Sequence, residues 1–110
     1  MKKVNRVLAN KDFSKIVKTG ITIRDNSYTV HYLKNELNKT RIGISVSTKL
    51  GNAVVRSRTR RQVRSICDSY IDYQKHSLDI IIVVRNGYFE NNFQDNSLIL
   101  KNILTEIGII

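Results

Sequence analysis

Four segments of the chain carry the residue patterns of β-strands. The stretch Arg41–Ser47 alternates apolar residues with small or polar ones, which is typical of a half-buried strand. Tyr28–Leu33 is rich in aromatic and β-branched residues. Leu78–Val84 is a nearly unbroken run of isoleucine and valine, and it predicts a central strand that is buried on both faces. A shorter extended piece begins at Ile21 and ends at a turn-like segment, residues 24–27.

Three other segments have the apolar spacing of helices. In the first, Phe13, Ile16 and Val17 share one face. Asn10 is placed to cap the start of this helix, and Gly20 is a natural stop at its end. The other two helices are predicted at residues 51–70, opened by Gly51-Asn52, and at residues 98–107, with an apolar face made by Leu98, Ile99, Leu100, Ile103, Leu104 and Ile107.

The predicted elements follow the order α-β-β-β-α-β-α. A sheet with helices packed on it in this order belongs to the α+β class. We interpret residues 34–39 as a hairpin loop and residues 86–96 as a polar loop. Residues 1–9 are basic and aperiodic, and we expect them to be extended or only partly ordered. A chain of 110 residues is long enough for one core, so we expect a single domain over residues 1–110.

The second predicted helix is amphipathic and strongly basic. At about 100° per residue its apolar positions fall in one sector, made by Val55, Val63, Ile66 and Tyr70. Its arginines fall largely on the other side, at positions 56, 58, 60, 61 and 64, with Arg56 near the boundary. The helix can therefore pack on a sheet and still turn its arginines outward.

Charge is distributed unevenly along the chain. The net charge is +10, but residues 1–64 hold sixteen lysines and arginines against three acids, whereas residues 65–110 hold three against six. The segment from 37 to 67 has no acid, so Lys39, Arg41 and Lys49 join the five arginines without a neutralising neighbour in sequence. Arginine donates paired hydrogen bonds to phosphate. We expect a polyanionic partner and favour nucleic acid over a solvated basic face or an anionic membrane, because solvated helix faces normally mix both signs of charge.

RNA is favoured over duplex DNA as that nucleic acid. A helix held against a sheet does not readily enter a major groove, and no second helix precedes it at helix-turn-helix spacing. Tyr28 and Tyr32 could stack on unpaired bases, although core positions are the more ordinary role for such residues. Alternation along the strand places Thr29, His31 and Leu33 on the opposite face. The two faces of the strand therefore cannot both be core and both be a platform for base stacking.

Little in the sequence points to protein-based catalysis or a metal site. Cys67 is the only cysteine, which excludes an internal disulfide and a cysteine-based zinc site, and we expect a buried core thiol. His31 and His76 lack a ligand spacing, and Asp68 and Asp72 are more simply solvated helix acids than a metal pair. No apolar run approaches the roughly 20 residues of a membrane span, and no signal peptide is visible, so we expect a cytoplasmic protein.

Three consecutive motifs then carry a resemblance to a known family. They read Gly43-Ile44-Ser45-Val46-Ser47-Thr48-Lys49, Gly51-Asn52-Ala53-Val54 and Arg56-Ser57-Arg58-Thr59-Arg60-Arg61-Gln62-Val63-Arg64. Together with Arg41-Ile42 they resemble the signature of the bacterial ribonuclease P protein subunit, which typically shows Gly-x-Ser-Val-Ser-Lys-Lys, Gly-Asn-Ala-Val and Arg-Asn-Arg-x-Lys-Arg-x-x-Arg. Residues 12–20 are similar to the first helix of that family, and residues 79–85 to its last strand.

The resemblance implies a fold and a function. The fold is a two-layer α-β sandwich with a mixed four-stranded sheet and a left-handed crossover through the arginine helix, against the usual right-handed preference. The function is that of a non-catalytic protein subunit of an endoribonuclease. Its partners are the ribonuclease P RNA subunit, which carries out the hydrolysis with Mg²⁺ bound mainly by RNA, and precursor tRNA, from which the 5′ leader is removed.

The resemblance also implies two sets of binding residues. For the RNA subunit these are Lys49, Asn52, Arg56, Ser57, Arg58, Arg60, Arg61 and Arg64, and for the precursor-tRNA leader they are Phe13, Lys15, Val17, Lys18 and His31. Ser57 replaces a usual asparagine, Val17 replaces a frequent second aromatic residue, and His31 stands where many relatives have tyrosine. The alternatives that remain open are a general RNA-binding module, such as a ribosomal or assembly protein, and a protein nuclease.

Overall fold

The computed structural model describes residues 1–6 and 9–110. Within these residues, three helices and four strands follow the predicted order. They are α1 (Asn10–Thr19), β1 (Ile21–Arg24), β2 (Tyr28–Lys34), β3 (Arg41–Ser45), α2 (Ala53–Tyr70), β4 (Leu78–Val84) and α3 (Phe93–Ile107). Short 3-10 segments accompany them at Lys3–Asn5, Thr48–Leu50 and Asn86–Glu90.

The four strands form one mixed sheet in the order β1-β2-β4-β3. β2 is antiparallel to both β1 and β4, whereas β3 and β4 are parallel neighbours that α2 connects. β2 and β3 are not neighbours, so the hairpin loop predicted for residues 34–39 is wrong, and Lys34 is the last residue of β2. β4 takes the place between them because its side chains are apolar on both faces and gain most from an interior position.

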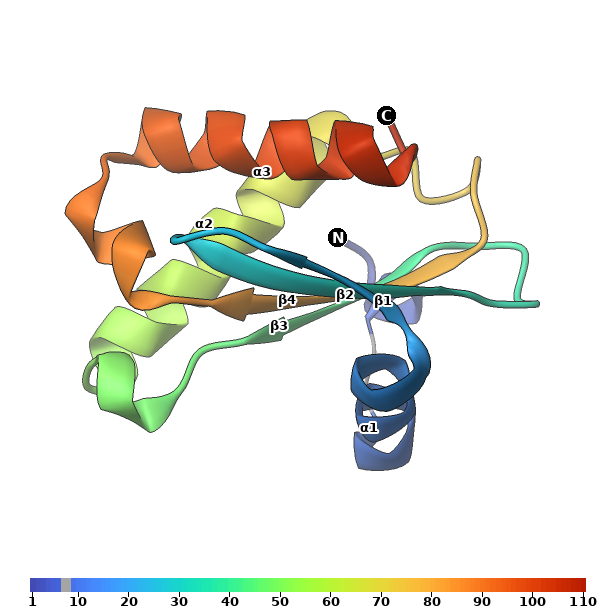
Figure 1. Ribbon diagram of the computed structural model, residues 1–110, viewed down its shortest axis with the longest axis horizontal. Helices are drawn as coiled ribbons and strands as arrows, with labels where there is room; N and C mark the ends of the chain where they lie inside the picture. Colours follow the sequence, from blue (N-terminus) through green and yellow to red (C-terminus); the bar gives the residue numbers. More distant parts are fainter. Residues whose placement is uncertain (7–8) are drawn as a thin grey trace.

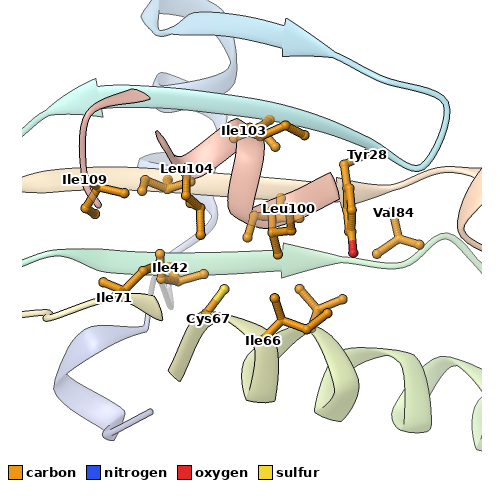
Figure 2. Close-up of a cluster of buried hydrophobic side chains, with 14 of the residues drawn as sticks. Tyr28, Ile42, Ile66, Cys67, Ile71, Val84, Leu100, Ile103, Leu104 and Ile109 are labelled. Carbon is orange, nitrogen blue, oxygen red and sulfur yellow. The ribbon is translucent and has the colours of Figure 1, made fainter. Parts of the chain in front are cut away.

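The main core lies between one face of the sheet and the helices α2 and α3, which cover that face together (Figure 1). Val30, Ile80 and Ile82 point into it from the strands and are fully buried. Figure 2 shows side chains of α2 and α3 meeting those of the sheet, among them Ile66, Cys67, Leu100, Ile103 and Leu104. Burial of each large aliphatic side chain contributes about 1.5–3 kcal/mol to folding. This core is what holds α2 against the sheet.

Tyr28, Tyr32 and Cys67, whose positions the sequence left as predictions, all belong to this core or pack against it. Tyr28 is fully buried, and its hydroxyl donates a hydrogen bond to the carbonyl of Asn96 at 2.9 Å, so Tyr28 is no stacking platform. Tyr32, on the same face of β2, is half-buried against the core. The core thiol predicted at Cys67 is confirmed, and burial raises its pKa to about 12, which keeps it protonated and unreactive.

The opposite face of the sheet carries α1 (Figure 1). Ile16 is 1% exposed there, and Ile81 of β4 is fully buried although it points away from the main core. The prediction that β4 is central and buried on both faces is therefore confirmed. α1 covers only part of this face. Thr29 of β2, Val83 of β4 and Ser45 of β3 form one row across the sheet, and all three residues are only half-buried.

The ends of two helices differ from the prediction. α1 begins at Asn10 with Ala9 at the capping position, so Asn10 does not cap it. Gly20 ends α1 as predicted, but for a reason other than a left-handed turn, since a Cβ atom there would lie 2.5 Å from the carbonyl oxygen of Ile16. α3 begins at Phe93 and not at Leu98, because Asn92 Oδ1 accepts a hydrogen bond from the amide of Asp95 and caps a polar first turn.

The described part of the N-terminal segment is ordered against the sheet. Lys3–Asn5 forms a 3-10 turn, and Arg6 makes a parallel bridge to Ile42 at the outer edge of β3. Asn5 is buried, and its Nδ2 donates to the carbonyl oxygen of Thr40 at 2.9 Å. An extended conformation is therefore wrong for residues 3–5, and for residues 7–8 the expectation lies outside the described residues.

Candidate nucleic-acid interface

The arginine helix starts where the sequence predicts. Asn52 caps α2, because its Oδ1 accepts a hydrogen bond from the amide of Val55 at 2.9 Å. The cap occupies the amide oxygen of Asn52 and leaves its Nδ2 to meet a ligand. Lys49 lies just before the helix in the 3-10 turn, with its side chain exposed. Both residues that were expected beside the arginines are thus at the N-terminal end of α2.

One face of α2 anchors the helix on the sheet. Val63 and Ile66 are buried as predicted, and Val55 and Tyr70 are half-buried. Thr59 is also buried, and its hydroxyl is satisfied by donating to the carbonyl oxygen of Val55 at 2.8 Å. The helix cannot turn its arginines inward without breaking this packing.

The remaining surface of α2 carries the positive charge in two stripes. Arg56, Arg60 and Arg64, four residues apart, border the buried face and are half-buried. Arg58 and Arg61 lie farther round the helix and are exposed, as is Ser57. We call the side chains expected to bind the RNA subunit the basic surface of α2; they are Lys49, Asn52, Arg56, Ser57, Arg58, Arg60, Arg61 and Arg64.

The described residues do not neutralise the basic surface of α2. Among the residues that the structure describes, no carboxylate forms an ion pair with any of its arginines. Burial lowers the pKa of Arg64, as do the positive charges of Arg6 and Arg60. The Nε of Arg56 donates to the carbonyl oxygen of Gly51 at 3.2 Å, which fixes the position of this guanidinium. A cluster held together against its own repulsion favours a bound polyanion.

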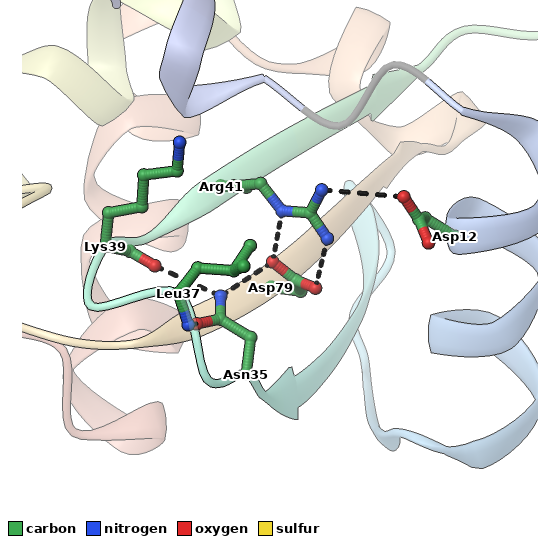
Figure 3. A network of polar contacts seen from close by, with 6 residues as sticks. All are labelled: Asp12, Asn35, Leu37, Lys39, Arg41 and Asp79. Carbon is green, nitrogen blue, oxygen red and sulfur yellow. Dashed lines mark hydrogen bonds and ion pairs between the residues drawn. The ribbon is translucent and has the colours of Figure 1, made fainter.

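Arg41 does not belong to this unpaired charge, contrary to the sequence-based expectation. Its Nε and Nη2 donate to the two carboxylate oxygens of Asp79 at 2.8 and 2.7 Å. Its Nη1 also lies 3.5 Å from Asp12 on α1, and Asn35 Nδ2 donates to Asp79 at 2.8 Å (Figure 3). The hydrogen bonds to Asp79 raise the pKa of Arg41. Asp79 is 38 residues away in the sequence, and only the β3–β4 pairing brings it to Arg41.

The residues expected to bind the leader lie on or near α1, on the face of the sheet away from α2. Lys15 and Lys18 are exposed, Val17 is 36% exposed and Phe13 is half-buried. A cavity of about 400 Å³ lies beside α1, and of the five expected residues only Lys15 is among the described residues that line it. Asp12, Ile16 and Arg41 also line this cavity, and none of them is among the residues expected to bind the leader.

His31 faces the same side as α1, as alternation along β2 predicts. It pairs with Thr22 of β1 and Ile81 of β4, and its Nδ1 lies 2.9 Å from the hydroxyl of Thr22. Burial lowers the pKa of His31, and the charge of Arg24 lowers it further. At neutral pH the ring is therefore uncharged, and it can stack on a base or exchange a hydrogen bond through its second nitrogen.

Many RNA-binding proteins carry a basic surface of this kind, and comparison with known proteins identifies the family. A sequence model of the family described as Ribonuclease P matches residues 1–108. The chain belongs to the ribonuclease P protein family. A ribonuclease P protein component from Streptococcus agalactiae is 38% identical, with all of both chains covered. Among solved structures, the Staphylococcus aureus RNase P protein is 31% identical with a TM-score of 0.85, covering 97% of this chain and 98% of that one.

A more distant ribonuclease P protein has the same fold. The protein from Thermotoga maritima is 29% identical, with a TM-score of 0.79 over 92% of this chain and 96% of its own. The α+β fold, its element order and its mixed sheet therefore match ribonuclease P proteins. In the part of the chain described by the structure, no helix is both long and apolar enough to cross a membrane.

Proposed function

We propose that this chain is the protein subunit of ribonuclease P and that it binds the catalytic RNA subunit through the basic surface of α2. The observation that carries the proposal is the exposed, acid-free arginine face of a helix whose other face is locked into the core, in a member of this family. Arginine fits this role because its planar guanidinium pairs with phosphate in bidentate geometry. Contact with several phosphates releases condensed counterions, which makes the binding strong and dependent on salt.

The leader of precursor tRNA is proposed to bind on the α1 side of the sheet. Phe13 and His31 offer rings for stacking, and Lys15 and Lys18 offer charge to phosphates. Val17 adds an exposed apolar contact. The half-buried row that crosses β2, β4 and β3 gives an extended strand of nucleotides a surface beside α1. The two RNA-binding surfaces then lie on opposite faces of the sheet, so both RNAs can bind at once.

The protein's part in the reaction is to bind and position RNA. Hydrolysis of the phosphodiester bond is assigned to the RNA subunit, with Mg²⁺ bound mainly by that RNA. Within the described residues, no group of three or more histidine, cysteine, aspartate or glutamate side chains is arranged to hold a metal ion. The basic surface of α2 neutralises phosphates of the RNA subunit, and the α1 side holds the leader near the scissile bond. The holoenzyme is proposed to act in the cytoplasm, on newly made precursor tRNA.

Reconstitution with a cognate RNA subunit tests this function. Cleavage of precursor tRNA is measured at a Mg²⁺ concentration where the RNA subunit alone is slow, with and without the protein. We expect the protein to restore cleavage and the Arg58→Ala/Arg61→Ala variant to restore less. Unchanged cleavage in spite of tight RNA binding would point to a general RNA-binding module. Cleavage by the purified protein without the RNA subunit would point to a protein nuclease.

A further inference from the structure

A surface pocket lies where α2 meets the start of α3. The pocket has a volume of about 410 Å³. It is lined by Arg58, Arg61, Gln62, Ser65 and Phe93. The first four come from one side of α2, and Phe93 is the first residue of α3. The sequence points to Arg58 and Arg61 by their charge alone, and it predicts a polar loop with no binding role at Phe93.

Phe93 is an aromatic side chain left largely in water. It is 43% exposed, and it is not among the side chains of the main core. A single exposed apolar residue is ordinary on a protein surface. Phe93 differs from an ordinary one because Arg58 and Arg61 share its pocket. Among the described residues, neither guanidinium has an ion-pair partner and no acid lines the pocket. An exposed ring flanked by arginines combines a stacking surface with phosphate ligands.

The pocket also contains an oriented hydrogen-bond donor. The hydroxyl of Tyr88 donates to Gln62 Oε1 at 2.7 Å. This bond holds the amide of Gln62 and leaves its two Nε2 protons for an acceptor. Tyr88 is buried, and its ring meets Tyr28 edge-on with centroids 5.7 Å apart, so the orientation of Gln62 is supported from the core. The hydroxyl of Ser65 adds a second polar group to the lining.

We propose that this pocket binds one unpaired nucleotide of the RNA subunit, with its base against Phe93 and its phosphates on Arg58 and Arg61. The inference rests on the proposed function, which it extends from phosphate contacts to a base contact. A base-paired nucleotide does not fit, because both of its faces are stacked within the duplex. Gln62 Nε2 then donates to an acceptor on the edge of the base. The leader is not the expected occupant, because α1 lies on the other face of the sheet.

The proposal is tested by the affinity of the protein for its RNA subunit over a range of salt concentrations. Phe93→Ala is expected to weaken binding by roughly 5- to 150-fold, the loss that corresponds to one stacked base. The slope of log affinity against log salt is expected to stay at the wild-type value, because a ring releases no counterions. Phe93→Tyr keeps the aromatic surface and is expected to bind nearly as well as the wild type. Phe89→Ala is the matched control, since Phe89 is 41% exposed in the preceding segment and does not line the pocket.

Three results would overturn the inference: unchanged affinity of Phe93→Ala, an equal loss in Phe89→Ala, or an equal loss in Phe93→Tyr. Thermal unfolding of each variant shows whether a loss of affinity follows a loss of fold. Failure of the underlying function would look different. In that case the wild-type protein itself would not bind the RNA subunit more tightly than an unrelated RNA, and no variant at residue 93 would matter.

Discussion

The guanidinium of Arg41 and the carboxylate of Asp79 face each other across the parallel pair β3–β4, joined by two hydrogen bonds of 2.8 and 2.7 Å. The Asp79 side chain is only 8% exposed and that of Arg41 18%. Asp12 on α1 approaches the same guanidinium at 3.5 Å. The pair therefore connects the two strands and also ties α1 to the sheet, beside the surface proposed for the leader.

Removal of one partner of this pair is expected to destabilise the protein. Asp79→Ala leaves a largely buried guanidinium without its main acceptor, and we expect a loss of about 3 kcal/mol in the free energy of unfolding. Urea unfolding measures this loss. Glu36→Ala, at an exposed acid on the same side of the molecule, is the control and is expected to change stability by less than about 0.5 kcal/mol. Equal stabilities for the two variants would contradict a structural role for the pair.

The Arg41–Asp79 pair also shows where sequence reasoning ends. Arg41 stands in an acid-free stretch, and the sequence therefore groups it with the charge that has no neutralising neighbour. Its partner lies 38 residues away and becomes a neighbour only because β4 inserts between β2 and β3. Within one helix, ion-pair partners lie three or four residues apart, so a sequence without nearby acids predicts unpaired basic residues. On a strand the partner can come from a distant strand, so the same absence predicts little.

The basic surface of α2 is the part of the site that the sequence predicts best. Helical periodicity alone separates Val63 and Ile66 from Arg58 and Arg61, and the structure confirms that division. The pocket at Phe93 was out of reach because the first turn of α3 is polar and shows no apolar period. Tyr28 was ambiguous for a similar reason, since an aromatic residue on a strand has the same pattern whether it is core or platform.

Phe13 and Ile16 are expected to separate leader binding from folding. Phe13→Ala should weaken the affinity of the holoenzyme for leader-bearing precursor tRNA by about 1–3 kcal/mol if a base stacks on the ring. Affinity for the RNA subunit and for mature tRNA should stay unchanged. The control is to measure the affinities for precursor tRNA and for mature tRNA with the same preparation of holoenzyme. If the Phe13→Ala holoenzyme bound both precursor tRNA and mature tRNA with wild-type affinity, the assignment of Phe13 to leader binding would be contradicted.

Ile16 provides the structural counterpart on the same helix. It is 1% exposed, and Ile16→Ala is expected to cost about 2–4 kcal/mol of unfolding free energy through lost burial and a residual cavity. Val17→Ala, at the next position and 36% exposed, should cost much less. Urea unfolding compares them. If both variants lost the same stability, α1 would not pack on the sheet through Ile16.

His31 is expected to make stability depend on pH. Burial and the charge of Arg24 lower its pKa below the ordinary 6.5, so the unfolded chain takes up a proton at a higher pH than the folded protein does. As pH falls below about 6.5, His31 binds a proton in the unfolded state but not yet in the folded state. Stability therefore decreases until the folded-state pKa is reached. Above that range this contribution is constant.

The His31→Gln variant tests this pH dependence. Unfolding free energies of the wild type and the variant are compared from about pH 5.5 to 7.5, where carboxylates contribute little change. The wild type should gain stability relative to the variant as pH rises to about 6.5, and the difference should then be constant. A difference that stays flat throughout, or that falls with rising pH, would show that His31 is not disfavoured in its charged form.

Binding of the RNA subunit by α2 is tested most directly by the salt dependence of the affinity for Arg58→Ala, with Arg85→Ala as the control. Both residues are exposed arginines, but Arg85 follows β4 and lies outside α2. We expect Arg58→Ala to weaken binding and to reduce the salt slope by about 0.7–0.9, the value for one phosphate contact, and Arg85→Ala to keep the wild-type slope. Equal slopes for all three proteins would contradict the claim that α2 holds the phosphates of the RNA subunit.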